Sequence, residues 1–321
     1  MTRRFNLALA AALLTAMALS LVAGKVWLPL SAWHGSDPRW LIIMELRLPR
    51  TVLAALVGAG LGLSGAAMQG YLRNPLADPG LFGVSSGAAL GAVISLFFGY
   101  TAAAWLLPAF ALTGAAISMA VLALLVGRSG SLIVFTLGGV ILSSIAGSMI
   151  ALAISLAPTP FASSQIVTWL MGALTDRSWA DVWLALPLIA VGAAVLALTA
   201  RSLDALTLGE PAARSMGVDP LRLQILIVVG VGICVGASVA AAGIIGFVGL
   251  MVPHLVRPFA GHRPSAVLLP SALGGALLLV VADSLVRAAP TVSELRLGIA
   301  MSMLGGPFFL ALLLRMRRQL P

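Results

Sequence analysis

Few side chains in this chain could carry out catalysis or bind a metal. The three histidines, His34, His254 and His262, show no spacing typical of zinc or haem ligands. We interpret His254, which follows Pro253, as a structural residue. Cys234 is the only cysteine, which excludes a disulfide or a cysteine metal cluster within one chain. No nucleophile lies beside a base, so we expect no catalytic residue, no metal site and no bound cofactor.

The single lysine excludes one kind of ATP hydrolysis. Lys25 lies in Gly24-Lys25-Val26, and no other lysine occurs. A phosphate-binding GxxxxGK[ST] loop is therefore impossible in this chain. Any ATP and Mg²⁺ used by this protein would be bound by a partner subunit.

Acidic residues within apolar segments would be the usual sign of ion coupling, and only one is present. Asp283 lies well inside such a segment, with Arg287 one helical turn later. Residues four apart lie on one helix face, so we expect these two to neutralise each other. Proton or sodium coupling, which uses buried carboxylates, is then poorly supported.

The composition requires lipid around these residues. Of the 321 residues 60% are hydrophobic and 9% charged, and the mean hydropathy is +1.09. A soluble domain is about 25% charged, because its surface faces water. We therefore expect an all-α membrane protein, a polytopic bundle of about ten transmembrane helices forming a single permease domain over 1–321.

Each crossing needs roughly 20 apolar residues. The gaps between charged residues predict ten spans, of which the third and eighth are short. The predicted spans are 6–27, 51–72, 84–99, 103–126, 131–156, 182–200, 223–241, 245–260, 265–287 and 297–314.

Basic residues at the two ends predict the orientation. Arg3 and Arg4 open the chain, and Arg315, Arg317 and Arg318 close it. An even number of spans places both termini on one side, and basic residues favour the cytoplasm. This threading places 12 of the 19 Lys and Arg inside and 7 outside. We expect a multi-pass protein of the bacterial inner membrane with cytoplasmic termini.

The N-terminus permits a second interpretation. Arg3-Arg4, the apolar run and the small residues around Ala16-Met17-Ala18 also resemble a secretory signal peptide. The run continues to Val22 and further spans follow, which favours a membrane span.

Two polar segments between spans predict structured surfaces. In the cytoplasmic segment 201–222, Pro211 suits the first turn of a helix, Glu210 suits its positive end and Gly217 suits the position after it. We expect a short helix at about 211–216 and a docking surface, preceded by Leu203, Leu206 and Leu208. The outer-side segment 158–181 carries tryptophans typical of a membrane interface, although a short helix there could also plug a pathway.

Ordered motifs resemble the FecCD family of ABC importer permeases, which carry iron–siderophore, haem or cobalamin. The motifs are Arg47-Leu-Pro-Arg50, Gly65-Ala-Ala-Met-Gln69, Asn74-Pro-Leu-Ala-Asp-Pro-Gly-Leu-Phe-Gly-Val-Ser-Ser-Gly87, Trp169-Leu-Met-Gly172, Leu208-Gly-Glu-Pro-Ala-Ala-Arg-Ser-Met-Gly217, Gly246-Phe-Val-Gly-Leu-Met-Val-Pro-His254, Ala282-Asp283 and Leu304-Gly-Gly-Pro-Phe-Phe309. The resemblance covers nearly the whole chain after about residue 40. Pro211 stands where many relatives carry another residue.

The resemblance implies the partners and the sites. It implies two permease subunits, which we expect to be identical, two cytoplasmic ABC ATPase subunits and a periplasmic or lipid-anchored substrate-binding protein, with membrane lipid around them and no nucleic acid. The ATPase would contact the segment 201–222 near Glu210, Ala213, Arg214 and Gly217.

Three outer arginines are a second implied site. Arg47 and Arg50 lie outside, against the positive-inside trend, and Arg287 ends span nine. Similar family members use such arginines to receive acidic side chains of the binding protein, by charge-assisted contacts. Lipid headgroup anchoring, or neutralisation of Asp283 by Arg287, is the alternative role.

Together these features predict the permease subunit of an ABC importer for an iron–siderophore complex, or for haem or cobalamin. The chain itself would not be an enzyme. An ion-coupled secondary transporter is the first alternative, and a membrane receptor or scaffold the second.

Overall fold

The fold is known from a computed structural model, which describes residues 2–24, 28–29, 33, 37, 39–100, 103, 105–127, 132–291 and 293–317. Lys25, His34 and Arg318, which entered the predictions above, lie outside these residues. The described part of the chain is all-helical and contains no β-strand. The predicted fold class is therefore confirmed.

In the part of the chain that the structure describes, ten helices correspond one to one to the ten predicted spans. They are α1 (Thr2–Val22), α3 (Leu48–Leu72), α4 (Val84–Phe97), α5 (Leu106–Val126), α6 (Leu132–Ser155), α8 (Trp179–Leu198), α11 (Pro220–Ala242), α12 (Val248–Ala260), α13 (Pro264–Ala288) and α14 (Leu297–Arg317). Eight described segments are long and apolar enough to cross a membrane. The helices α4 and α12 have 14 and 13 residues. At 1.5 Å per residue they are too short for a hydrocarbon core of about 30 Å.

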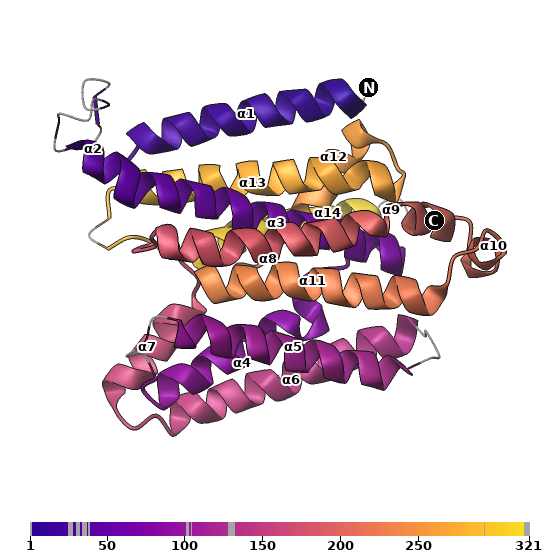
Figure 1. The fold of residues 1–321 in the computed structure, drawn as a ribbon, viewed down its shortest axis with the longest axis horizontal. Helices are drawn as coiled ribbons and strands as arrows, with labels where there is room; N and C mark the ends of the chain where they lie inside the picture. The colour runs from indigo at the N-terminus through magenta and orange to yellow at the C-terminus, as the bar shows by residue number, and fades with distance from the viewer. Residues whose placement is uncertain are drawn as a thin grey trace.

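Short helices lie at the two ends of the bundle. They are α2 (Arg39–Leu41), the π-helix η2 (Ile42–Arg47), the 3₁₀ helix η3 (Pro79–Phe82), α7 (Pro160–Leu170), α9 (Ala200–Leu206) and α10 (Glu210–Ser215). Figure 1 shows α2 and α7 at one end and α10 at the other, together with both termini. The short helix predicted at 211–216 is therefore present, one residue earlier.

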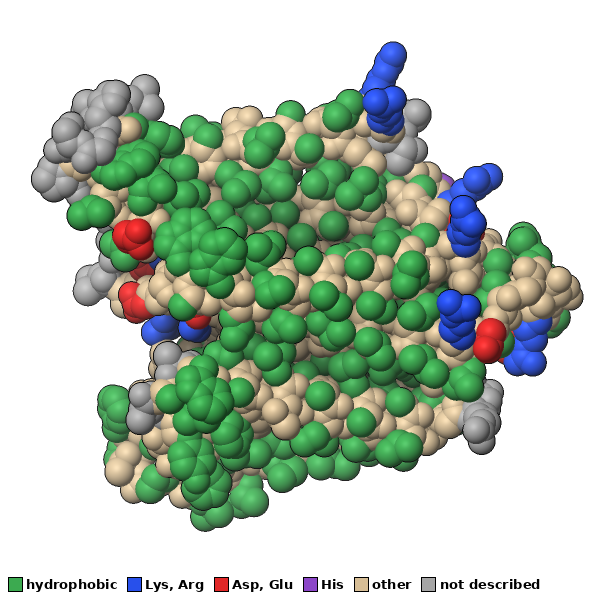
Figure 2. All heavy atoms as spheres, in the orientation of Figure 1, with side chains coloured by type: hydrophobic (Ala, Val, Ile, Leu, Met, Phe, Trp, Pro, Cys, Tyr) green, Lys and Arg blue, Asp and Glu red, His purple; other side chains and the backbone are tan. Residues whose placement is uncertain are grey.

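Charged side chains gather at these two ends, and apolar side chains cover the length between them. In Figure 2 most of the visible Lys and Arg lie at the end that carries α10 and the termini. We therefore expect the long axis of the molecule to lie along the membrane normal, and the positive-inside rule predicts that the basic end faces the cytoplasm.

The centre of the bundle is the pair α3 and α13, which touch backbone to backbone. A Cβ atom at Gly58 would overlap the carbonyl of Gly275, and one at Gly62 would overlap the carbonyl of Ser271. Small residues allow such an approach where lipid removes the hydrophobic drive between helices. Glycines spaced four apart in α4 pack in the same way, because a Cβ at Gly91 would overlap the carbonyl of Phe110 in α5.

Candidate functional site

The outer end of α3 carries a buried ion pair with α13. Arg50 donates from Nε to both carboxylate oxygens of Asp283, at 3.1 and 2.9 Å, and from Nη2 to Oδ1 at 2.8 Å. Its Nη1 donates to Glu294 Oε2 at 2.9 Å. Asp283 is only 1% exposed, so the carboxylate depends on this partner for its charge.

The other two outer arginines bind the end of α1. Arg47 Nη1 donates to the carbonyl oxygens of Leu21 and Val22 at 2.9 and 2.7 Å. Arg287 Nη2 donates to the carbonyl and the hydroxyl oxygen of Ser20 at 2.5 and 2.8 Å. We call Arg47, Arg50, Asp283, Arg287 and Glu294 the outer arginine cluster. It ties together α1, α3, α13 and the loop before α14.

One expectation about this cluster was wrong. Asp283 pairs with Arg50 and not with Arg287, although Arg287 is one turn away on the same helix. Arg50 lies across the tight contact between α3 and α13 and donates to Asp283 from two guanidinium nitrogens. A contact through two nitrogens is stronger than a single hydrogen bond. Glu294 and Ser20 are partners that the sequence did not reveal, since no spacing links them to the arginines.

The predicted docking arginines therefore have structural partners. Arg47, Arg50 and Arg287 are 8%, 8% and 6% exposed. The structure brings all three into one cluster at the outer end but leaves little of their surface accessible.

The predicted ATPase-coupling residues lie together at the cytoplasmic end. The segment 201–222, here called the coupling segment, folds into α9 and α10 before α11 begins. Glu210 and Arg214 form an ion pair of 2.6 Å on the exposed face of α10. Ala213 is buried beneath them, and Gly217 has a φ of +85° in the turn that follows.

Two leucines of this segment are buried against the bundle, whereas two apolar side chains near α10 are exposed. Leu203 and Leu206 are buried, whereas Leu208 and Met216 are 67% and 64% exposed. An exposed apolar pair beside an ion pair is a composition suited to a protein partner. The sequence placed Leu208 before the helix but did not separate anchoring from exposed leucines.

Asp204 connects the coupling segment to α13. Its carboxylate accepts hydrogen bonds from the backbone N–H of Ser265 at 2.9 Å and from the Ser265 hydroxyl at 2.6 Å. A carboxylate at the first turn of a helix satisfies a free N–H and favours the positive helix end. Sequence reasoning missed this contact, because 61 residues separate the two.

The family-like motifs meet where α12 begins inside the bundle. Gln69 Nε2 lies 3.3 Å from the carbonyl oxygens of Gly249 and Leu250, and its Oε1 accepts from Arg257 at 2.8 Å. Phe247 has a φ of +68°, and its ring occupies the space that a Cβ at Gly305 of α14 would fill. The contacts of Gln69 and Phe247 therefore position α12 against α3 and α14.

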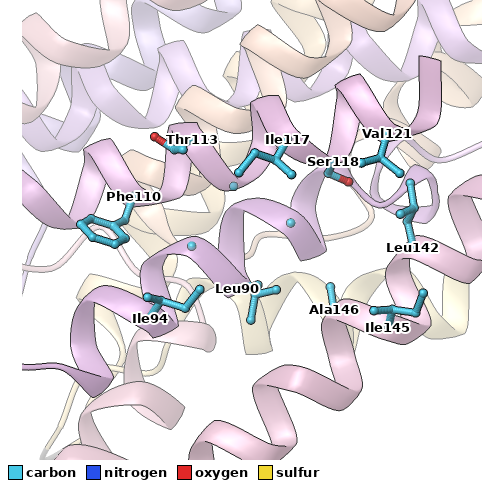
Figure 3. A pocket seen from close by; sticks show the side chains of 13 residues that line it. Leu90, Ile94, Phe110, Thr113, Ile117, Ser118, Val121, Leu142, Ile145 and Ala146 are labelled. Carbon is cyan, nitrogen blue, oxygen red and sulfur yellow. The ribbon is translucent and has the colours of Figure 1, made fainter. Parts of the chain in front are cut away.

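An apolar cavity of about 370 Å³ lies between α4, α5 and α6. Figure 3 shows Leu90 and Ile94 of α4 facing this space together with Phe110 of α5 and Ile145 of α6. Its walls carry no charged side chain.

A bundle of apolar helices with a structured segment at one end and a buried charge cluster at the other is typical of a polytopic membrane protein. Its sequence matches the FecCD transport family over residues 12–315, and the chain belongs to this family. The match extends the resemblance, which began near residue 40, almost to the N-terminus.

Individual relatives cover nearly the whole chain. The ABC transporter permease YvrB of Bacillus subtilis is 39% identical, over 94% of this chain and 90% of that protein. The vitamin B12 import permeases BtuC of Klebsiella pneumoniae and Salmonella paratyphi A are 38% and 39% identical, over 98% of this chain and 95% and 96% of theirs. A solved structure described as a metal-chelate type ABC transporter in an inward-facing conformation matches with a TM-score of 0.90 and 30% identity. It covers 98% of this chain and 99% of its own.

These relatives settle the class of the protein. It is a permease of ABC importer type, and ATP hydrolysis is not a task of permease subunits in this family. It is a membrane protein with multiple apolar helices.

Proposed function

We propose that this chain is the membrane-spanning subunit of an ABC importer for a metal chelate or corrinoid delivered by a substrate-binding protein. The near full-length similarity to vitamin B12 import permeases is the observation that carries the proposal. On this ground we propose cobalamin as the first candidate cargo, ahead of the iron–siderophore complexes and haem that the sequence suggested. We further propose that the importer contains two copies of this chain and two ATPase subunits in the bacterial inner membrane.

The coupling segment is the proposed seat of the ATPase. The Glu210–Arg214 pair is exposed, and the apolar side chains Leu208 and Met216 lie beside it. Movement of the ATPase would pass through α9 to α13, because Asp204 holds the first turn of α13. The helix α13 packs along α3, so both ends of the bundle would move with it.

The outer arginine cluster is the proposed seat of the binding protein. Glu294 is 21% exposed at its side chain and shares Arg50 with the buried Asp283. An acidic side chain of a binding protein could replace Glu294 on Arg50 at low cost, since Asp283 would keep the guanidinium neutralised. Docking would then use Arg50 without breaking the buried pair.

Ion coupling has no support in the described residues. Asp283, the buried carboxylate that would have to bind a proton or sodium ion, is occupied by the Arg50 fork. Both oxygens of this carboxylate accept hydrogen bonds from Arg50, so it offers no free oxygen pair to a transported ion.

Reconstitution in liposomes tests the proposal. The chain is combined with its ATPase and binding protein, and uptake of radiolabelled cyanocobalamin is compared with uptake of a ferric siderophore. We expect uptake that requires ATP, the ATPase and the binding protein. Uptake by the chain alone, driven by a proton or sodium gradient, would falsify the importer assignment. ATP-dependent uptake of the siderophore alone would reverse the order of cargoes.

A further inference from the structure

A cavity of about 360 Å³ lies at the outer end of the bundle, and its lining includes none of the residues of the outer arginine cluster. Its walls come from α7, from the loop that follows α7 and from the residue before α14. Ser164, Gln165 and Thr168 of α7 line one side, and Arg177 and Arg296 line the other. The cavity therefore joins hydroxyl, amide and guanidinium groups contributed by distant parts of the chain.

Neither of the two arginines of this cavity is held in a short ion pair like that of Arg50 with Asp283. Among the described residues, the side chain of Arg296 has no hydrogen bond or ion pair. Arg177 has a single long contact, 3.4 Å from Nη1 to Asp181 Oδ1, and its Nε has no partner. The other oxygen of Asp181 accepts hydrogen bonds from the N–H and hydroxyl of Ser178.

Neither arginine is favoured by the helix that follows it. Arg296 directly precedes α14, and Arg177 lies two residues before α8. Helix N-termini carry a partial positive charge, so a cation there gains no stability from the helix. Both also lie on the outer side, where basic residues are disfavoured.

The walls of the cavity contain more hydrogen-bond donors than acceptors. The indole Nε1 of Trp169, another lining residue, is buried without an acceptor among the described residues. Asp176 is the single carboxylate that lines the cavity, against two guanidinium groups. The group that suits such a cavity is rich in acceptor oxygens and negatively charged, such as a carboxylate or a phosphate.

We propose that this cavity is a subsite for an anionic oxygen group of the cargo at the outer entrance of the permease. The proposal rests on the proposed import function, because it identifies the bound group as part of the cargo. A cavity of this size encloses a small anionic group and is too narrow for the lobe of a protein partner. The arginines would draw the carboxylate or phosphate of the cargo into the entrance.

Cysteine labelling tests the charge of the cavity without any ATPase or binding protein. Cys234 is the only native cysteine and is 0% exposed. It should therefore not react with the thiol reagents, and all labelling should come from the introduced cysteine. A Ser164→Cys variant in dodecyl maltoside is labelled with an anionic and with a cationic methanethiosulfonate reagent of similar size. We expect the anionic-to-cationic rate ratio to fall roughly tenfold when Arg177→Gln and Arg296→Gln are added, because local positive charge concentrates anions.

The matched control is Arg39→Gln, which removes an outer arginine already paired with Asp37. This variant should leave the ratio unchanged. An equal ratio in the presence and absence of Arg177 and Arg296 would overturn the proposal.

Ligand protection distinguishes the source of the anion. Citrate and glycerol 3-phosphate should slow labelling of Ser164→Cys, glycerol should not, and the slowing should disappear in the double arginine variant. The measurement is repeated in nanodiscs of phosphatidylglycerol without added anion. Slowing by this lipid alone would assign the cavity to a headgroup and overturn the cargo assignment. Uptake in liposomes is measured separately, so failure of this subsite leaves the importer assignment standing.

Discussion

At the scale of single residues, the outer arginine cluster shows how buried charges constrain one another. Three arginines and two carboxylates lie within one network, and the Arg50–Asp283 pair is its most buried part. Removing one partner of a buried pair leaves the other charge uncompensated, and that is far more costly than the pair itself. The cluster is therefore expected to be a point of high sensitivity.

The change Asp283→Asn tests this sensitivity. We expect it to lower the free energy of unfolding by about 3–5 kcal/mol, because Arg50 stays buried with only Glu294 to neutralise it. The measurement is thermal unfolding of the purified chain in detergent. Arg39→Gln, at an exposed pair, is the control and should change the melting temperature little. A melting temperature of Asp283→Asn equal to that of the control would contradict the structural role of the Arg50–Asp283 pair.

Gly217 is a second residue whose role is local. Its φ of +85° suits glycine, and a Cβ there would meet no neighbouring atom. Gly217→Ala should therefore act through backbone strain alone, of about 1 kcal/mol. We expect faster hydrogen exchange at the amides of Gly217 and Val218, which close the turn after α10. Ser215→Ala should leave these amides protected, and equal exchange in both variants would exclude the strain.

At the scale of helices, α13 is the element that connects the two candidate sites. In its first turn Ser265 donates hydrogen bonds to Asp204 of the coupling segment, and its last turns carry Asp283 and Arg287. Along its length it packs on α3 at glycines, so the two helices have little freedom to slide. If the ATPase binds the coupling segment as proposed, this pair of helices would connect it to the outer end.

Tight packing of α3 on α13 predicts a steric effect. Gly58→Ala places a methyl group on the backbone of Gly275, so we expect a loss of about 1–3 kcal/mol in stability from overpacking. Gly147→Ala in α6 is the matched control, because a Cβ there meets no atom within 4 Å. Thermal unfolding compares the two variants. Equal melting temperatures would show that α3 and α13 separate easily.

The link from the coupling segment to α13 predicts a functional effect. Asp204→Ala removes the cap on Ser265 and should cost about 1 kcal/mol of stability. We expect a larger effect on coupling, seen as less cargo taken up per ATP hydrolysed in liposomes. The neighbouring Ser202→Ala should keep the normal ratio. An unchanged ratio for Asp204→Ala would place the path of coupling elsewhere.

At the scale of the whole molecule, the distribution of charge gives the orientation in the membrane. Basic side chains gather at the end with α10 and the termini, and an apolar surface separates the two ends (Figure 2). A protein oriented by the positive-inside rule then presents the coupling segment to the cytoplasm and the outer arginine cluster to the outside.

Membrane-impermeant thiol reagents test this orientation, again on the background of the buried Cys234. In right-side-out vesicles, Ser164→Cys should react directly, and Ser215→Cys only after the membrane is permeabilised. Each variant serves as the control of the other. The reverse pattern would invert the predicted topology and with it both proposed sites.

Much of the helical architecture was determined by the sequence alone. The ten spans follow from runs of uncharged residues, because a helix in lipid must satisfy its own backbone and cover its length with apolar side chains. The short helix α10 was predicted almost to the residue, because Glu210, Pro211 and Gly217 act on their own backbone. Local rules of this kind need no knowledge of neighbouring helices.

The partners of the charged side chains were decided only by the tertiary structure. Proximity along α13 suggested Arg287 for Asp283, but the packing of α3 on α13 brings Arg50 closer with better geometry. Asp204 and Ser265, or Arg177 and Arg296, likewise meet only after helices far apart in sequence have packed. A buried charge such as that of Asp283 takes the best partner available in three dimensions, and sequence spacing does not contain that information.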